Sequence, residues 1–312
     1  MLGDDVIRGI VESAEKEASR FDEPRELTFE RFPYARLMTV EIEAEPIMPD
    51  ADPSSGLSER FTGRDWEVRR EPSLSKKGVE FVSPTTSGDT LDEEVRFAVD
   101  ALRSAGYDAT PWASVHVHVD ARDMDQRTVG KIILLSGVNQ DNVYQVCPRH
   151  RYNSPFCQPF PIAFIRALEG RLRDDDRSDC ISDVWEDYLG ATMGHSQAAW
   201  HRPSRWYGVN YRPFRSQGSV EWRMFNEPLD ADAIMRWCEV VHQIVDRGAT
   251  MEIDDIVEPK DWSDFFRMLS LRPSTYADMR RRRRKHWLSG RGSPDYTGLP
   301  TVHPAEGDDA AE

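Results

Sequence analysis

Val115-His116-Val117-His118-Val119 is the stretch that decides the fold of this chain. β-Branched valines alternate in it with histidines, and residues two apart on a strand point to the same face of a sheet. One face of this strand would therefore bury valines, while the other would present both imidazoles. Two distant stretches repeat the pattern with charged residues, Glu41-Ile42-Glu43 and Glu221-Trp222-Arg223. Together they predict a sheet with one apolar face and one face of carboxylates, imidazoles and a guanidinium.

The rest of the chain alternates predicted strands with predicted helices. The strands are expected at 37–43, 66–70, 79–82, 113–119, 206–211 and 219–225. Helices are expected at 4–19, 90–105, 125–146, 161–173, 230–247, 261–271 and 274–287, with loops at 44–63 and 149–160. A capping box of Thr90 and Glu93 and a cap at Asp230 mark two of the helix starts. Paired, alternating strands between helices favour an α+β fold with a mainly antiparallel sheet.

The composition limits which partners the protein can have. The chain has 312 residues, 39% of them hydrophobic, and a formal net charge of −15. An acidic surface of this kind repels nucleic acid and anionic membranes, so we expect neither as a partner. The basic run Arg280–Arg284 would spread around a helix, and we interpret it as a solvated helix or a contact with the protein's own acidic surface. The chain lacks a run of about 18 apolar residues and a signal peptide, so we expect a cytoplasmic protein.

The cysteines do not form a metal-binding or redox motif in the sequence. The four of them are Cys147, Cys157, Cys180 and Cys238, and none forms a CxxC pair. Cys147 and Cys157 could meet in space, but free thiols in a reducing compartment are the expectation.

Three carboxylates alternate along the first predicted strand, at Glu41, Glu43 and Glu45. They could form an acidic, solvent-exposed face, but like charges on one face repel each other. A divalent cation would relieve that repulsion, because hard oxygen ligands suit Mg²⁺. Glu80 adds a carboxylate on another strand, either as a single exposed acid or, after the basic residues that precede it, in a phosphate-binding neighbourhood.

The other two stretches also allow a structural and a functional interpretation. His116 and His118 could be hydrogen-bonded histidines or metal ligands, although a zinc site would need more His or Cys nearby. Glu221 and Arg223 could be a surface ion pair, or a metal ligand beside an arginine that binds a phosphoryl oxygen or a carboxylate. The chain contains no GxxxxGK[ST] or GxGxxG motif, so any ATP site must use another architecture.

Taken in order, these pieces resemble the putative amidoligase family of the carboxylate–amine ligase superfamily, whose members are relatives of glutamine synthetase and glutamate–cysteine ligase. The resemblance runs from about residue 37 to residue 247. Five landmarks carry it: Val40-Glu41-Ile42-Glu43, Gly78-Val79-Glu80-Phe81-Val82-Ser83-Pro84, Val115-His116-Val117-His118-Val119, the Arg149–Gln158 loop with Arg151, Tyr152, Asn153 and Cys157, and Tyr207–Asn210 leading to Val220-Glu221-Trp222-Arg223-Met224-Phe225. The family's Asp-Gly-Ser turn reads Glu71-Pro72-Ser73 here, so the resemblance does not extend to the loop on the substrate side.

The resemblance implies an antiparallel sheet that forms a half-barrel funnel flanked by helices, with ATP at one end and Mg²⁺ ions on strand carboxylates. The domains implied are a helical extension (1–30), the amidoligase-like domain (31–250), C-terminal helices (251–289) and a disordered tail (290–312). The metal ligands implied are Glu41, Glu43, Glu80, His116 and Glu221, with Glu41 and Glu43 on different ions. His118 and Arg223 would bind phosphate oxygens, and Arg70 and Arg151 would contact substrate or phosphate.

The activity that follows is ATP-dependent formation of an amide or isopeptide bond through an acyl phosphate, with Glu221 and Arg223 as catalytic residues. The substrates would be a small-molecule or peptide carboxylate and an amine, of unspecified identity. A metal-dependent hydrolase that uses the Glu and His face to activate water is the alternative enzyme class. A non-catalytic binding or structural protein that retains the fold is the third possibility. The sequence leaves the oligomeric state open.

Overall fold

The computed structural model describes residues 35–47, 57–71, 73–74, 78–154, 156–174, 184, 207–226 and 229–288. Its centre is a sheet with the strand order β2-β3-β1-β5-β7-β6, and β4 pairs with one end of β1. The strands are β1 (Met38–Pro46), β2 (Glu67–Arg70), β3 (Val79–Val82), β4 (Tyr107–Asp108), β5 (Val115–Asp120), β6 (Val209–Asn210) and β7 (Ser219–Phe225). All the ladders between these described strands are antiparallel, which confirms the predicted sheet type. Closure into a half-barrel funnel stays a prediction.

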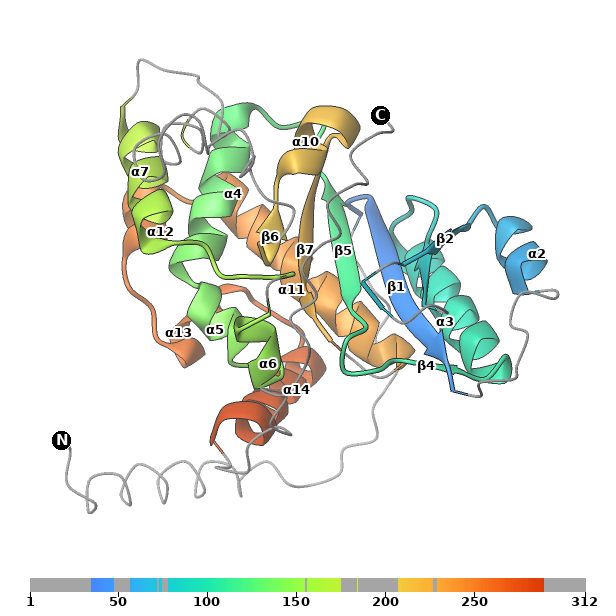
Figure 1. Cartoon of the computed structure of the whole chain (residues 1–312). Helices are drawn as coiled ribbons and strands as arrows, with labels where there is room; N and C mark the ends of the chain where they lie inside the picture. The colour runs from blue at the N-terminus through green and yellow to red at the C-terminus, as the bar shows by residue number, and fades with distance from the viewer. Residues whose placement is uncertain are drawn as a thin grey trace, which may run out of the picture. The chain divides into compact units, whose positions relative to one another are not determined.

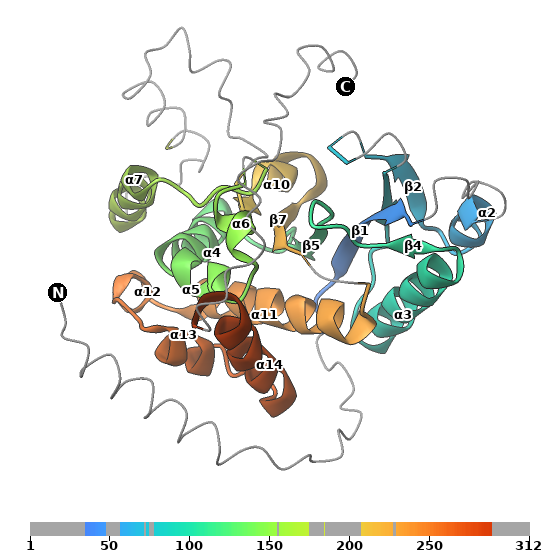
Figure 2. The same ribbon diagram turned by 60° about the horizontal axis from the view of Figure 1, so that its bottom comes forward.

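Helices flank the sheet and make up most of the remaining regular structure of the described chain (Figure 1). They are α2 (Leu57–Thr62), α3 (Gly88–Ser104), α4 (Gln126–Val138), α5 (Gln140–Tyr144), α6 (Arg149–Tyr152), α7 (Ile162–Arg173), α10 (Arg212–Gln217), α11 (Ala231–Thr250), α12 (Ile253–Val257), α13 (Trp262–Met268), α14 (Pro273–Arg283) and the π-helix η2 (Arg284–Leu288). Figures 1 and 2 show α3 and α11 along the same face of the sheet, with α13 and α14 beyond α11.

The strand pleat separates an apolar face from a polar face, as the alternation predicts. On β1, Val40 and Ile42 are fully buried and belong to the main core cluster, together with Val117 of β5 and Trp222 of β7. The same cluster contains the inward residues of α3 and α11, such as Trp237. The residues between them in sequence point to the opposite face, which α3 and α11 leave uncovered. Core packing therefore orients the polar residues of four strands toward one surface.

Two predicted helix starts have opposite outcomes. The carboxylate of Asp230 accepts a hydrogen bond from the amide of Ala233, so this cap is confirmed. The capping box at Thr90 is wrong, because α3 begins at Gly88 and follows Ser87, which makes no side-chain cap. Thr90 therefore lies inside the first turn.

Short helices occupy several segments that were predicted as loops or as parts of longer elements. Helix α10 lies between β6 and β7, where a loop was expected. Pro213 stands in its first turn, and Gly218 ends it in the left-handed region with φ of 72°. Proline is favoured at a helix start and glycine just past its end, so these two residues bound a helix. The predicted helix at 125–146 is likewise divided at Asn139 into α4 and α5.

Other parts of the sequence prediction fall partly or wholly outside the described residues. The predicted helix at 4–19, the extension at 1–30, the segment 185–204 and the tail at 290–312 lie outside them. Cys147, Cys157 and Cys238 are buried free thiols, as expected. None of the helices in the described part of the chain has the length and apolar character needed to cross a membrane.

Candidate active site

Strand register brings the predicted acidic and imidazole residues together on the polar face. On β1, Glu41 lies opposite His116 of β5, and Glu43 lies opposite Glu80 of β3. Directly opposed residues of an antiparallel pair project to the same face, so these four side chains meet there. All of them are largely buried, although they are ionisable.

The next strand completes the group. Glu221 of β7 lies opposite His118 of β5, and Asn210 of β6 lies opposite Glu221. The Nε2 atom of His118 is 3.2 Å from Oε1 of Glu41, and its Nδ1 is 3.3 Å from the hydroxyl of Ser219. Both predicted histidines therefore face the carboxylates, in accordance with the alternation of β5.

His116 is the centre of the arrangement. Its Nδ1 atom is 2.7 Å from Glu41, 3.4 Å from Glu221 and 3.9 Å from Glu80. Its Nε2 atom is 3.4 Å from Oε1 of Glu43. A single buried imidazole thus stands among four carboxylates of the described strands. A group of this kind needs protons or cations to offset its negative charge.

The close packing of ionisable groups shifts the pKa values of His116 and of three of the carboxylates around it. Burial and the charge of Arg223 oppose protonation of His116, but the hydrogen bond to Glu41 and two further carboxylates raise its pKa to about 9. Burial and the neighbouring charge of Glu41 raise the pKa of Glu80 to about 8. Burial also raises the pKa of Glu43. For Glu41, burial acts in the same direction, but hydrogen bonds from both histidines outweigh it and hold the pKa well below its usual range.

The ligand atoms form two overlapping groups that fit divalent cations. Glu41, His116 and Glu221 offer atoms within 4.8 Å of one another, and so do Glu43, Glu80 and His116. Carboxylate oxygens with one imidazole suit Mg²⁺ or Mn²⁺. The Nε2 atom of His116 is buried and has no hydrogen-bond partner among the described residues. Neutral imidazole has one lone pair, so His116 can coordinate one ion while its other nitrogen donates to a carboxylate.

Arg223 lies on the same face as these groups. Its side chain is 14% exposed, and Nη1 is 3.5 Å from Oε1 of Glu221. The arginine therefore combines burial with a position at the edge of the carboxylate cluster. This is the place where it could meet an anionic group held by cations at the cluster.

Strand register separates Arg70 from Glu80, and the contact of Arg70 with substrate or phosphate stays a prediction. Arg70 lies opposite Val79 on the other face of β2, and it is Arg69 that lies opposite Glu80. Although burial opposes it, a hydrogen bond from Arg69 to Glu67 and the charges of Glu67, Glu80 and Glu41 raise the pKa of Arg69. Sequence reasoning missed Arg69 because a shift of one residue in a four-residue strand exchanges its two faces.

Arg151 of α6 bonds to residues at the edge of the site, and its positive charge opposes the rise in the pKa of Glu43. Its guanidinium donates to the carbonyl oxygens of Arg223 and Met224 and to the hydroxyl of Ser114. Two further residues had no assigned role in the sequence. The backbone amide of Ser114 donates to Oε2 of Glu43 over 2.7 Å, and Asn210 donates to Oε2 of Glu221. The available signal for Asn210 was a single polar amide in a predicted strand, 206–211, whose other residues are aromatic, apolar or glycine.

Comparisons with known proteins place the chain in a family. No curated protein matches it. A bifunctional glutathione synthetase from Pasteurella multocida aligns with a TM-score of 0.41 at 9% identity, over 81% of this chain and 48% of its own. A structure described as a novel glutamine synthase homolog aligns with a TM-score of 0.37 at 10% identity, over 81% of this chain and 65% of its own. The chain thus spans less than two thirds of either protein. The family described as "putative amidoligase enzyme" matches residues 16–245, and the chain therefore belongs to this family.

Proposed function

We propose that this protein is an ATP- and Mg²⁺-dependent ligase that joins a carboxylate to an amine through an acyl-phosphate intermediate. The observation that carries the proposal is the two sets of candidate metal ligands, each with two carboxylates, that share the buried imidazole of His116. The guanidinium of Arg223 lies beside them. Cations held by these carboxylates, together with the guanidinium of Arg223, would supply positive charge for a polyphosphate in a protein whose net charge is −15. Membership of the amidoligase family supports the reaction class.

The reaction would proceed in two balanced steps. A carboxylate oxygen of the acid substrate attacks the γ-phosphorus of ATP, the bond to the bridging oxygen breaks, and ADP leaves. The amine nitrogen then attacks the acyl carbon, the bond between carbon and the phosphate oxygen breaks, and phosphate leaves as the nitrogen loses a proton. Phosphoryl transfer depends on positioning and charge neutralisation more than on covalent help from the protein. A site rich in fixed charges suits that requirement.

The carboxylates would divide between two ions. Glu41 and Glu221 would hold one Mg²⁺, Glu43 and Glu80 would hold the other, and His116 would serve one of the two ions through a single ring nitrogen. Cations held by these residues would supply positive charge that offsets the negative charge developing during phosphoryl transfer. The protein's own contribution is to hold these ligands in place on strands whose opposite face is packed in the core.

Arg223 and His118 would act on the phosphates directly. Arg223 would stabilise the equatorial oxygens of the transferring phosphoryl group, and removing such a donor costs on the order of 10²–10³ in kcat. His118 would contact a phosphate oxygen from the neighbouring strand position. Glu221 would contribute to metal binding, because it belongs to the set with Glu41 and His116, and to the position of Arg223, because it lies beside that guanidinium.

The remaining expectations belong to the same proposal. The substrates would be a small-molecule or peptide carboxylate and an amine, ATP would occupy one end of a funnel-shaped sheet, and the enzyme would act in the cytoplasm without nucleic-acid or membrane partners.

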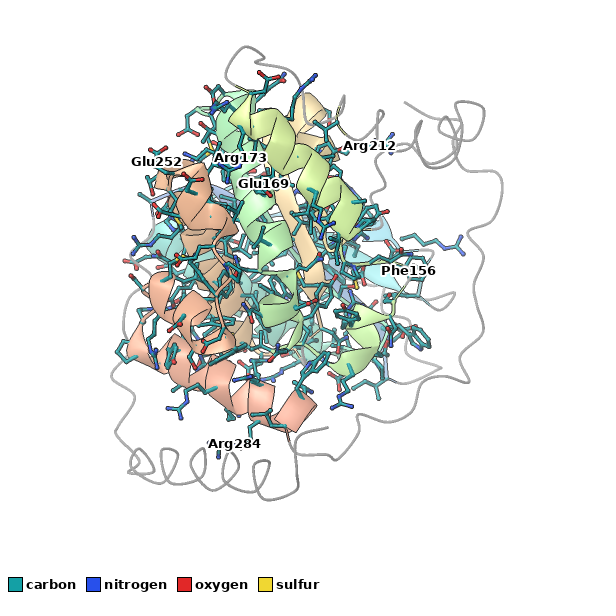
Figure 3. All side chains as sticks on the ribbon, turned by 90° about the vertical axis from the view of Figure 1, so that its left-hand side faces the viewer. Phe156, Glu169, Arg173, Arg212, Glu252 and Arg284 are labelled. Carbon is teal, nitrogen blue, oxygen red and sulfur yellow. The ribbon has the colours of Figure 1, made fainter. Side chains whose placement is uncertain are left out.

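The decisive experiment is Mg²⁺-dependent ADP release with a panel of acids and amines. Wild type is compared with Glu221→Gln and with the control Glu252→Gln. Glu252 is exposed and lies immediately before α12, a helix that contacts α7 (Figure 3). We expect turnover in wild type and in Glu252→Gln and none in Glu221→Gln. Equal rates in the two variants would refute the assignment. Absence of ATP binding in calorimetry with Mg²⁺ present would favour the hydrolase alternative.

A further inference from the structure

The guanidinium of Arg151 makes its hydrogen bonds inside the protein, to strand β7 and to the residue that precedes strand β5. Arg151 belongs to α6 and is 4% exposed. Its Nη2 atom donates to the carbonyl oxygen of Arg223 over 2.8 Å and to Oγ of Ser114 over 3.1 Å. Its Nε atom donates to the carbonyl oxygen of Met224 over 3.2 Å. The side chain thus joins β7 to the residue that precedes β5.

The contact with β7 falls on an irregularity of the sheet. Val117 pairs with Trp222 and Val115 pairs with Phe225, so β7 advances three residues where β5 advances two. Such a β-bulge displaces carbonyl groups from the regular ladder and changes the direction of the side chains it carries. Arg151 donates to the two carbonyl groups within the bulge. These belong to Arg223, whose guanidinium faces the carboxylates, and to Met224.

Ser114 connects Arg151 to Glu43 through hydrogen bonds. The Ser114 amide donates to Oε2 of Glu43 over 2.7 Å, and the Glu43 amide donates to the Ser114 carbonyl oxygen over 3.0 Å. Ser114 is therefore bonded to Glu43 twice and to Arg151 through its hydroxyl. Outer partners that orient metal ligands commonly change metal affinity by about 10- to 100-fold when they are removed.

The backbone of Arg151 is itself supported. The thiol of Cys157 lies 3.2 Å from the carbonyl oxygen of Arg151, and the hydroxyl of Tyr144 donates to the carbonyl oxygen of Cys157. All three residues are buried.

We infer that Arg151 is a positioning residue that stabilises the β-bulge carrying Arg223 and, through Ser114, orients the carboxylate of Glu43. Its role is to couple the arginine that would act on the phosphoryl group to one of the two ion groups. The catalytic part of this inference rests on the proposed function, whereas the geometric part does not.

The test compares Arg151→Met, Arg151→Lys and Ser114→Ala with the control Arg149→Met. Arg149 lies on the same helix, is exposed and donates to carbonyl oxygens of His286 and Trp287, away from the site. Four quantities are measured: Mn²⁺ affinity by electron paramagnetic resonance, kcat, KM for ATP, and the thermal unfolding temperature. Arg151→Met should weaken Mn²⁺ binding about 10- to 100-fold and lower kcat with little change in KM.

The other variants make the result specific. Arg151→Lys can replace one of the three hydrogen bonds and should show smaller losses. Ser114→Ala keeps the amide bond to Glu43 and should weaken Mn²⁺ binding only a few-fold, with effects that do not add fully to those of Arg151→Met. Arg149→Met should match wild type in Mn²⁺ affinity and kcat. If Arg151→Met does not fold, Arg151→Lys and Ser114→Ala decide the question.

Two outcomes of the binding and kinetic measurements would overturn the inference. Unchanged Mn²⁺ affinity and kcat in both Arg151 variants would remove the positioning role, and a raised KM at unchanged Mn²⁺ affinity would make Arg151 a substrate contact. If wild type consumes no ATP, the proposed function fails separately. Metal-free crystal structures of wild type and Arg151→Lys then decide: displaced carbonyl groups at 223 and 224 and a rotated Glu43 support the inference, and unchanged positions refute it.

Discussion

Asn210 donates a hydrogen bond of 2.7 Å from Nδ2 to Oε2 of Glu221, and its own Oδ1 accepts from the backbone amide of Arg212. The second bond fixes which way the amide group of Asn210 points. Glu221 is therefore held by a neutral donor at one oxygen while its other oxygen faces His116 and Arg223. The carboxylate is oriented before any cation arrives.

We expect Asn210→Ala to weaken Mn²⁺ binding about 10- to 100-fold, because Glu221 loses the partner that orients it. The exposed Asn153 at the end of α6 provides the control variant, Asn153→Ala. Mn²⁺ titration followed by electron paramagnetic resonance measures both. Equal affinities in the two variants would show that Glu221 needs no such support.

Mg²⁺ should stabilise the folded protein, and Glu80 should be required for the full effect. A ligand that binds only the folded state adds about 2.7 kcal/mol of stability at 100 times its Kd. In the metal-free protein, Glu80→Gln removes a carboxylate whose charged form is opposed by burial and by Glu41. We therefore expect this variant to unfold at or above the wild-type temperature without Mg²⁺ and to gain less when Mg²⁺ is added.

Differential scanning fluorimetry with and without Mg²⁺ measures this behaviour. The exposed carboxylate of Glu252 provides the control variant, Glu252→Gln, which should gain as much from Mg²⁺ as wild type. A full Mg²⁺ response in Glu80→Gln would exclude Glu80 as a ligand.

Arg69 and Arg70 should differ in their effect on activity. Arg69 lies opposite Glu80 on the face of the site, whereas Arg70 lies opposite Val79. A partly exposed charge contact contributes up to about 1 kcal/mol, which corresponds to about fivefold in kcat/KM. We expect a loss of this size in Arg69→Ala and none in Arg70→Ala. Steady-state kinetics of both variants provide the check, and the opposite order would mean that β2 is shifted by one residue.

The folded protein should lose stability in mild acid through His286. Burial and the nearby charges of Lys285, Arg282 and His150 lower the pKa of His286 to about 4. The unfolded chain binds this proton below about pH 6.5. The folded state binds it only near pH 4, so the contribution is complete above pH 6.5 and is lost progressively as the pH falls toward 4.

Urea unfolding at pH 7 and pH 5 measures the effect. The difference in unfolding free energy between the two pH values should be smaller in His286→Gln than in wild type. The same difference in both proteins would mean that His286 titrates equally in the folded and unfolded states.

Patterns with a period of two residues were sufficient for much of the site. Glu41 with Glu43 and His116 with His118 each share a face because the residue between them is apolar and enters the core. The cap at Asp230 is similarly local, since it needs only one carboxylate and an amide three residues away. The resemblance to the amidoligase family, confirmed over residues 16–245, rests on the same short patterns.

Relations between strands were beyond these local patterns. Which arginine of β2 faces Glu80 depends on register, and the direction of Arg223 depends on a bulge between β5 and β7. The buried position of Arg151 arises because α6 packs where those carbonyl groups are exposed to it. The helix at 212–217 depends on Pro213 and Gly218, two residue types that occur equally well in loops.

By itself, the sequence determined which side chains of each strand share a face and that the strands form an antiparallel sheet. The physical reason is local: side chains alternate between the two faces of a strand, and the face with the apolar side chains is buried in the core. Only the tertiary structure decided that the carboxylates converge on His116 in two groups and that Arg151 serves as their support. Those relations depend on pairing between residues more than 30 positions apart, which no local preference encodes.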